Sequence, residues 1–159
     1  MKTFLVSVFL FCAINSYSQD ATKIAHIDSL VSSINKLNLQ VYIDSSAKKI
    51  PDAEISMNLY LTTVFDAGIL KKYQVKNSSS DSRDGISTPF IQSTTFYYDQ
   101  GQLIKVEESR LQYENRSDVE WYYSNDTLLK YTGKDPAKAN TLLANGKEYF
   151  KRIKWREKK

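Results

Sequence analysis

The segment Thr95-Phe-Tyr-Tyr-Asp-Gln-Gly-Gln-Leu-Ile-Lys105 contains the pattern that decides the fold, because two related segments stand elsewhere in the chain. Its part from Asp99 to Lys105 corresponds to Asp66-Ala-Gly-Ile-Leu-Lys-Lys72 and to Ser124-Asn-Asp-Thr-Leu-Leu-Lys130. Each copy follows a run rich in aromatic or β-branched residues. A short polar turn between two such runs is typical of a β-hairpin. The chain is therefore predicted to form an antiparallel sheet by repeated use of one hairpin.

Alternating and aromatic-rich runs predict the other strands, and two segments with helical spacing flank them. The predicted strands cover residues 39–43, 55–65, 69–76, 91–98, 103–113, 119–123 and 128–132, with a turn at 45–51 and a polar loop at 77–89. An amphipathic helix is predicted from Ala21, with Asp20 as its cap and a length of about 17 residues. A second helix is predicted from Pro136 to about Trp155. The alternative is that Asn145-Gly146 ends this helix and an edge strand follows.

These elements predict an α+β fold: an antiparallel sheet of about six or seven strands, with the N-terminal and C-terminal helices packed on one face. The alternative is a lipocalin-like or cone-shaped half-barrel that encloses a ligand cavity. Residues 19–159 are expected to form one domain, because their number suits a single hydrophobic core.

The hairpin pattern also predicts which side chains share a face. A two-residue turn at Gln100-Gly101 would place Tyr98 opposite Leu103 and Phe96 opposite Lys105. The lysines that end the three copies would then share a face with aromatic rings, and their stems would lie on those rings while the ammonium groups stay in water. We predict that the helices cover the lysine-free face and that the aromatic–lysine face is open for binding. The predicted contact residues are Phe96, Lys105, Trp121, Lys130 and Lys72. Under the alternative, these rings pack on one another beneath the 77–89 loop.

Residues 1–18 resemble a secretory signal peptide. Lys2 precedes an apolar run from Phe4 to Ile14, and small residues stand at Ser16 and Ser18 before Gln19. We therefore expect an exported protein, periplasmic or secreted. Cys12 is the one cysteine of the chain, so the mature protein would have no disulfide and no thiol chemistry. No other segment is apolar enough to cross a membrane.

The chain has a net charge of +4, and its basic residues are concentrated in the segment 147–159. A basic end can contact nucleic acid or anionic lipid. A solvated helix end, stabilised by the helix dipole, is the preferred interpretation. We therefore expect no nucleic-acid partner.

Residues Tyr98, Asp99, Gly101, Leu103 and Lys105 resemble the tyrosine–aspartate repeats of bacterial surface and toxin shells, and also MORN-type repeats. Partial copies stand at Asp66, Gly68, Leu70 and Lys72, and at Tyr123, Asp126, Leu128 and Lys130. The resemblance implies hairpins and carries no catalytic residue. The order from helix to hairpins to helix is similar to that of small exported bacterial proteins without an assigned function.

The sequence contains little that could perform catalysis. His26 is the one histidine, which excludes a catalytic triad or a zinc site built from several imidazoles. Glu107 and Glu108 are adjacent on a strand and should point to opposite faces. The segment from Asp81 to Gly85 offers oxygen ligands but lacks the alternation of a calcium loop, so it is interpreted as a solvated loop. We predict no metal and no cofactor.

The predicted function is therefore that of an exported, non-enzymatic binding protein whose partner is a protein, a peptide or a glycan. Its oligomeric state cannot be read from the sequence. The alternatives are an inhibitor or immunity-type protein, an envelope component that self-associates through sheet edges, a lipocalin-like carrier, and an enzyme that uses Tyr, Lys and carboxylate groups.

Overall fold

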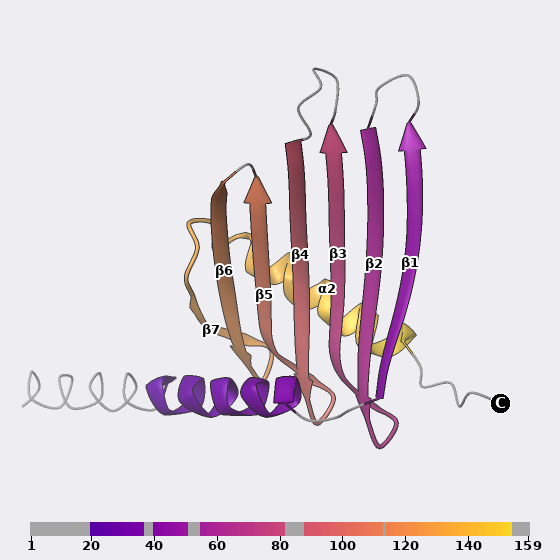
Figure 1. The fold of residues 1–159 in the computed structure, drawn as a ribbon. Helices are drawn as coiled ribbons and strands as arrows, with labels where there is room; N and C mark the ends of the chain where they lie inside the picture. Colours follow the sequence, from indigo (N-terminus) through magenta and orange to yellow (C-terminus); the bar gives the residue numbers. More distant parts are fainter. Residues whose placement is uncertain (1–19, 37–39, 51–54, 82–87, 113, 154–159) are drawn as a thin grey trace, which may run out of the picture.

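The computed structural model describes residues 20–36, 40–50, 55–81, 88–112 and 114–153, so the predicted signal peptide lies outside the described residues. An N-terminal helix covers residues 20–36 (Figure 1). Seven strands and a second helix, α2, follow in the order β1 (Gln40–Ile50), β2 (Ile55–Asp66), β3 (Ile69–Asp81), β4 (Thr88–Asp99), β5 (Gln102–Gln112), β6 (Asn115–Ser124), β7 (Thr127–Tyr131) and α2 (Lys138–Arg152).

The strands form one antiparallel sheet in which each strand pairs with its neighbours in the sequence, from β1 at one edge to β7 at the other. The predicted α+β fold is confirmed, and the sheet is open rather than closed into a barrel. Some strands are longer than predicted. β1 continues through the predicted turn as far as Ile50. β3 extends into the predicted loop as far as Asp81, and β4 already begins within that loop at Thr88. These polar segments are part of the strands because their backbones pair continuously with the neighbouring strands.

The three repeated segments form three hairpin turns of the same kind. Both central residues of each turn have positive φ angles: 48° and 78° at Ala67-Gly68, 48° and 81° at Gln100-Gly101, and 48° and 64° at Asn125-Asp126. Two successive residues in this region define the type I′ turn, whose twist matches that of the strands it joins. The predicted two-residue turn at Gln100-Gly101 is confirmed.

A β-bulge follows each of these turns on the second strand. In the central hairpin Tyr98 pairs with Leu103 as predicted, but Tyr97 then pairs with Lys105, so Ile104 is the additional residue. The pairing shifts by the same amount between Val64 and Phe65 and between Tyr122 and Tyr123. A bulge places two residues opposite one and reverses the faces of all later residues on its strand.

The predicted face assignment is wrong for this reason. Lys72, Lys105 and Lys130 pair with Tyr97 and Tyr122 rather than with Phe96 and Trp121. Phe96 instead pairs with Val106, which also pairs with Trp121. The lysines and the two predicted aromatic contacts therefore lie on opposite faces of the sheet.

The two helices also lie on opposite faces, which differs from the predicted arrangement on one face (Figure 1). Ile27, Val31 and Ile34 of the N-terminal helix form one core cluster with Tyr97, Ile104 and Tyr122. The other cluster combines Ala139 and Leu142 of α2 with side chains of five strands, which are Phe65, Leu70, Tyr73, Phe96, Tyr98, Leu103, Val106, Trp121 and Tyr123. Aromatic and β-branched side chains project from both faces of the central strands, so each face needs its own cover.

α2 runs without interruption through Asn145-Gly146, as the preferred prediction stated. Gly146 allows the helix to approach the sheet closely, because a Cβ atom there would lie 2.8 Å from Leu103 Cδ2. Two tyrosine hydroxyl groups of the sheet donate to helix carbonyl oxygens at 2.9 Å, Tyr98 to Gly146 and Tyr123 to Ala139. No helix in the described part of the chain is long and apolar enough to cross a membrane.

Candidate functional site: a polar depression beside the Lys105 cluster

Lysine and tyrosine alternate in one row across five strands, on the face that carries the N-terminal helix. The row consists of Lys72, Tyr97, Lys105, Tyr122 and Lys130, which pair in this order from β3 to β7. The Nζ atoms of Lys72, Lys105 and Lys130 lie 5.4, 4.7 and 5.8 Å from the ring centroids of Tyr97, Tyr122 and Tyr122 respectively. The row follows directly from the three bulges, since each bulge turns its lysine to this face.

The central lysine of the row is buried and surrounded by carboxylates. Lys105 is 4% exposed. Its Nζ lies 3.0 Å from Asp28 of the N-terminal helix, 3.0 Å from Glu107 and 2.8 Å from Glu120. An ammonium group has three donors, and here each donor faces one carboxylate. We refer to Lys105 with these three carboxylates as the Lys105 cluster.

The tyrosines of the row complete the hydrogen bonding of the Lys105 cluster. The hydroxyl of Tyr97 donates to Glu107 Oε2 at 2.9 Å. The hydroxyl of Tyr122 lies 3.0 Å from both Asp28 Oδ1 and Glu120 Oε2. Glu107 therefore receives a hydrogen bond on both oxygens, while Glu120 and Asp28 share the single hydroxyl proton of Tyr122. Fixed donors hold these carboxylates in one geometry, as a preorganised site requires.

The same contacts determine the ionisation of the Lys105 cluster. Burial by itself would lower the pKa of Lys105, but its hydrogen bonds to Glu120, Tyr122, Glu107 and Asp28 raise the pKa above its ordinary value. Burial also raises the pKa of Tyr97 and of Tyr122 to about 12. At neutral pH the lysine is therefore a cation and both tyrosines are neutral donors.

A depression of about 340 Å³ lies beside the Lys105 cluster. It is farther from the hairpin turns than Lys105 is. Its lining residues come from the four central strands and include Gln74, Thr95, Tyr97, Glu107, Ser109 and Glu120. Arg116 and Asp118 also line it and pair with each other at 2.8 Å. The volume falls within the range of small-molecule sites, and the lining is mostly polar. We call this site the polar depression.

The structure separates the residues that were predicted to bind together. Phe96 and Trp121 are 3% and 2% exposed and lie on the α2 face, while Lys105 is buried in its cluster. Lys72 and Lys130 are on the same face as Lys105, and Lys72 Nζ donates to Asn35 Oδ1 at 2.8 Å. The predicted open aromatic–lysine face is therefore absent from the described structure.

The binding residues predicted from the sequence do not include Glu107 and Glu120, which border the polar depression. The sequence neighbour of Glu107 is Glu108, whose side chain points to the α2 face and binds Lys138 Nζ at 2.7 Å. The actual partner of Glu107 is Glu120, which lies directly opposite on β6. Aligning the polar positions of adjacent predicted strands would have identified this pair.

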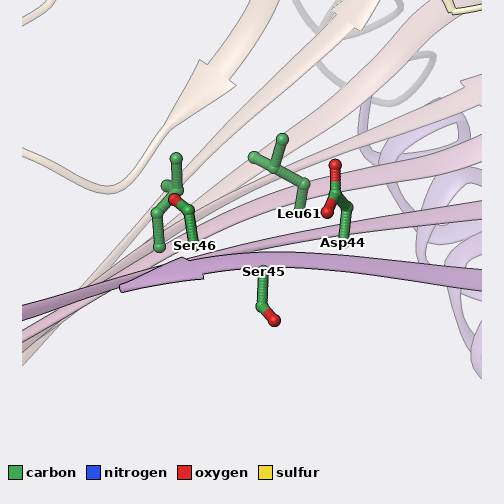
Figure 2. Close-up of a pocket in the computed structure, with 5 residues that line it drawn as sticks. Asp44, Ser45, Ser46 and Leu61 are labelled. Atoms are coloured by element: carbon green, nitrogen blue, oxygen red, sulfur yellow. The ribbon is translucent and has the colours of Figure 1, made fainter. Parts of the chain in front are cut away.

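Two other depressions lie on the described surface. One of about 500 Å³ lies between the N-terminal helix and β7 and is lined by Asp20, Ala21, Ile24, Ala25, Asp28, Leu129 and Lys130. The other, of about 40 Å³, lies at β1 and is lined by Asp44, Ser45, Ser46, Leu59 and Leu61 (Figure 2). This volume is sufficient for a few water molecules only.

Within the described residues, no group of three or more His, Cys, Asp or Glu side chains is arranged to hold a metal ion. Comparison of the chain with protein-family models, curated proteins and solved structures found no match. The resemblance to tyrosine–aspartate and MORN-type repeats therefore remains a prediction.

Proposed function

We propose that this protein is an exported binding protein that holds a polar, donor-rich ligand in the polar depression. The export part of the proposal is supported by the signal-like sequence of residues 1–18. The binding part is supported by one observation: the groups presented at the border of the depression are carboxylate acceptors fixed by a buried lysine.

The hydrogen bonds of the Lys105 cluster indicate what kind of ligand fits. The three ammonium donors of Lys105 and the hydroxyl donors of Tyr97 and Tyr122 face carboxylates of the same cluster. Each carboxylate oxygen has two acceptor positions, so Glu107 and Glu120 can accept further hydrogen bonds. These glutamates are 34% and 36% exposed. A ligand with several hydroxyl, amide or ammonium donors, such as a glycan or a peptide, matches this arrangement.

The same geometry favours binding over acid–base catalysis. A carboxylate pair that acts as acid and base needs one protonated member. Glu107 and Glu120 instead lie 3.0 and 2.8 Å from one shared ammonium group, so both are held as acceptors by the same fixed donor. Lys105 is itself held as a cation and cannot act as a nucleophile in that form.

The test is a titration of the isotope-labelled protein, followed by amide chemical shifts, with two small donor-rich probes: glucosamine and a lysine-containing tripeptide. We expect shifts at Gln74, Thr95, Glu107 and Glu120, and their loss in the double variant Glu107→Gln/Glu120→Gln. The matched control is Glu114→Gln, since Glu114 is exposed and outside the polar depression. Shift changes confined to other surfaces, or equal binding by the double variant, would refute the proposal.

A further inference from the structure

β1 forms one edge of the described sheet. Its eleven residues pair with β2 in a continuous register from Gln40–Phe65 to Ile50–Ile55, and β1 has no second neighbour in the described sheet. Monomeric proteins usually protect such an edge with charged side chains, a proline, a bulge, a short strand or a cover. The charged side chains of β1 are of both signs, so they do not by themselves repel a second copy of the strand. β1 contains no proline and no register shift, and Ile43 on it is 70% exposed. Within the described sheet, the outer edge of the β1 segment from Ile43 to Lys48 has no pairing strand.

The side chains of β1 carry a charge pattern that is complementary to itself. Figure 2 shows Asp44 and Ser46 on the same side of the strand as Leu61, with Ser45 on the other side. Because alternate residues of a strand share a face, Lys48 lies on the side of Asp44. Asp44 and Lys48 are both exposed. One strand therefore presents an anion and a cation on the same face, four residues apart.

We propose that β1 pairs with β1 of a second copy of this chain, in an antiparallel arrangement with its twofold axis at Ser46. This axis places Asp44 of each copy opposite Lys48 of the other, so two cross-strand ion pairs form. An axis at Asp44 or at Lys48 would instead place like charges opposite each other. Of these three axes charge thus favours the one at Ser46, the axis that forms two ion pairs, and the sheets of the two copies join into one continuous sheet. The polar depression lies on the central strands, so this interface is independent of it.

The experiment measures self-association of the full mature chain by sedimentation at increasing protein concentration. We expect the average mass to rise toward that of a dimer. Either single reversal, Asp44→Lys or Lys48→Asp, creates two like-charge contacts and should weaken association by about tenfold or more. An equimolar mixture of the two variants should associate again, because each copy then offers the charges that the other lacks. The combined variant Asp44→Lys/Lys48→Asp should also associate.

A matched control and the mixture of the two single variants separate loss of the ion pairs from a general effect of changed charge. Lys134→Asp changes the charge by the same amount at an exposed position between β7 and α2, and it should leave association unchanged. A chain that stays monomeric up to about 1 mM would overturn the proposal, since that limit corresponds to a negligible affinity. So would undiminished association of either single variant, or a mixture of the two folded variants that stays monomeric.

Discussion

Tyr97 and Tyr98 are adjacent in the chain, yet their hydroxyl groups donate on opposite sides of the sheet, to Glu107 Oε2 and to the carbonyl oxygen of Gly146, each at 2.9 Å. Tyr98 connects the sheet to α2, and Tyr97 belongs to the polar network beneath the N-terminal helix. One dipeptide at a hairpin turn therefore contributes to both layers of the fold. The predictions below test the contacts on each side.

Lys105→Met should destabilise the fold, because it leaves three carboxylates close together without their shared cation. We expect a loss of about 3 kcal/mol in the free energy of unfolding, measured by urea denaturation near pH 7. Lys130→Met removes an exposed lysine from the same row and should cost less than about 1 kcal/mol. Equal losses in the two variants would show that burial of the central lysine is unimportant.

Stability should fall at alkaline pH. Tyr97, Tyr122 and Tyr123 have pKa values raised to about 12 in the folded protein, chiefly by burial. Between pH 10 and 12 the unfolded chain has released these protons and the folded protein keeps them, so stability decreases as the pH rises. The pKa of Lys105 is also raised in the folded protein. At pH values above the ordinary lysine pKa, this group therefore also lowers the stability as the pH rises.

Tyr97→Phe provides the measurement of this alkaline effect. Removing one titrating group should flatten the dependence of the unfolding free energy on pH by about 1.4 kcal/mol per pH unit. Tyr131→Phe is the control, since Tyr131 is 36% exposed and lies outside the Lys105 cluster. An unchanged slope in Tyr97→Phe would contradict the assignment.

Gly146→Ala should destabilise the protein, although alanine favours helices. The added Cβ would lie 2.8 Å from Leu103 Cδ2 and 3.3 Å from Phe96 Cδ1, within the packed core. We expect a cost of about 1–3 kcal/mol, seen in thermal and urea unfolding. At the neighbouring exposed position, Asn145→Ala should instead stabilise by about 0.5 kcal/mol. Stabilisation by both exchanges would indicate that α2 lies farther from the sheet.

Ala67→Asn should stabilise the first repeated hairpin. Ala67 has a φ angle of 48°, a region in which alanine is unfavourable and asparagine is preferred at this turn position. We expect a gain of about 0.5–1 kcal/mol in urea denaturation. The same exchange at Ala144, an exposed position of α2, should cost about 0.5 kcal/mol, because asparagine is a weaker helix former. A loss at Ala67 would argue against the type I′ turn.

The fold was predictable from the sequence where a turn, a helix start or a helix is encoded by a few neighbouring residues. Gln100-Gly101 indicated a two-residue turn, Asp135-Pro136 indicated the start of the C-terminal helix, and the spacing of Ile24, Ile27 and Val31 indicated the N-terminal helix. The site was not predictable in the same way. Glu107 and Glu120 are distant in sequence and meet only because β5 and β6 pair in a specific register.

The sequence by itself determined the positions of the strands and turns, since turn chemistry and alternating apolar residues act over a few neighbouring residues. Only the tertiary structure decided which face each lysine occupies. A bulge changes local pairing by one residue and exchanges the faces beyond it, so the position of Lys105 depends on the pairing of two strands. The covering of both faces by helices also follows from the packing of the whole sheet.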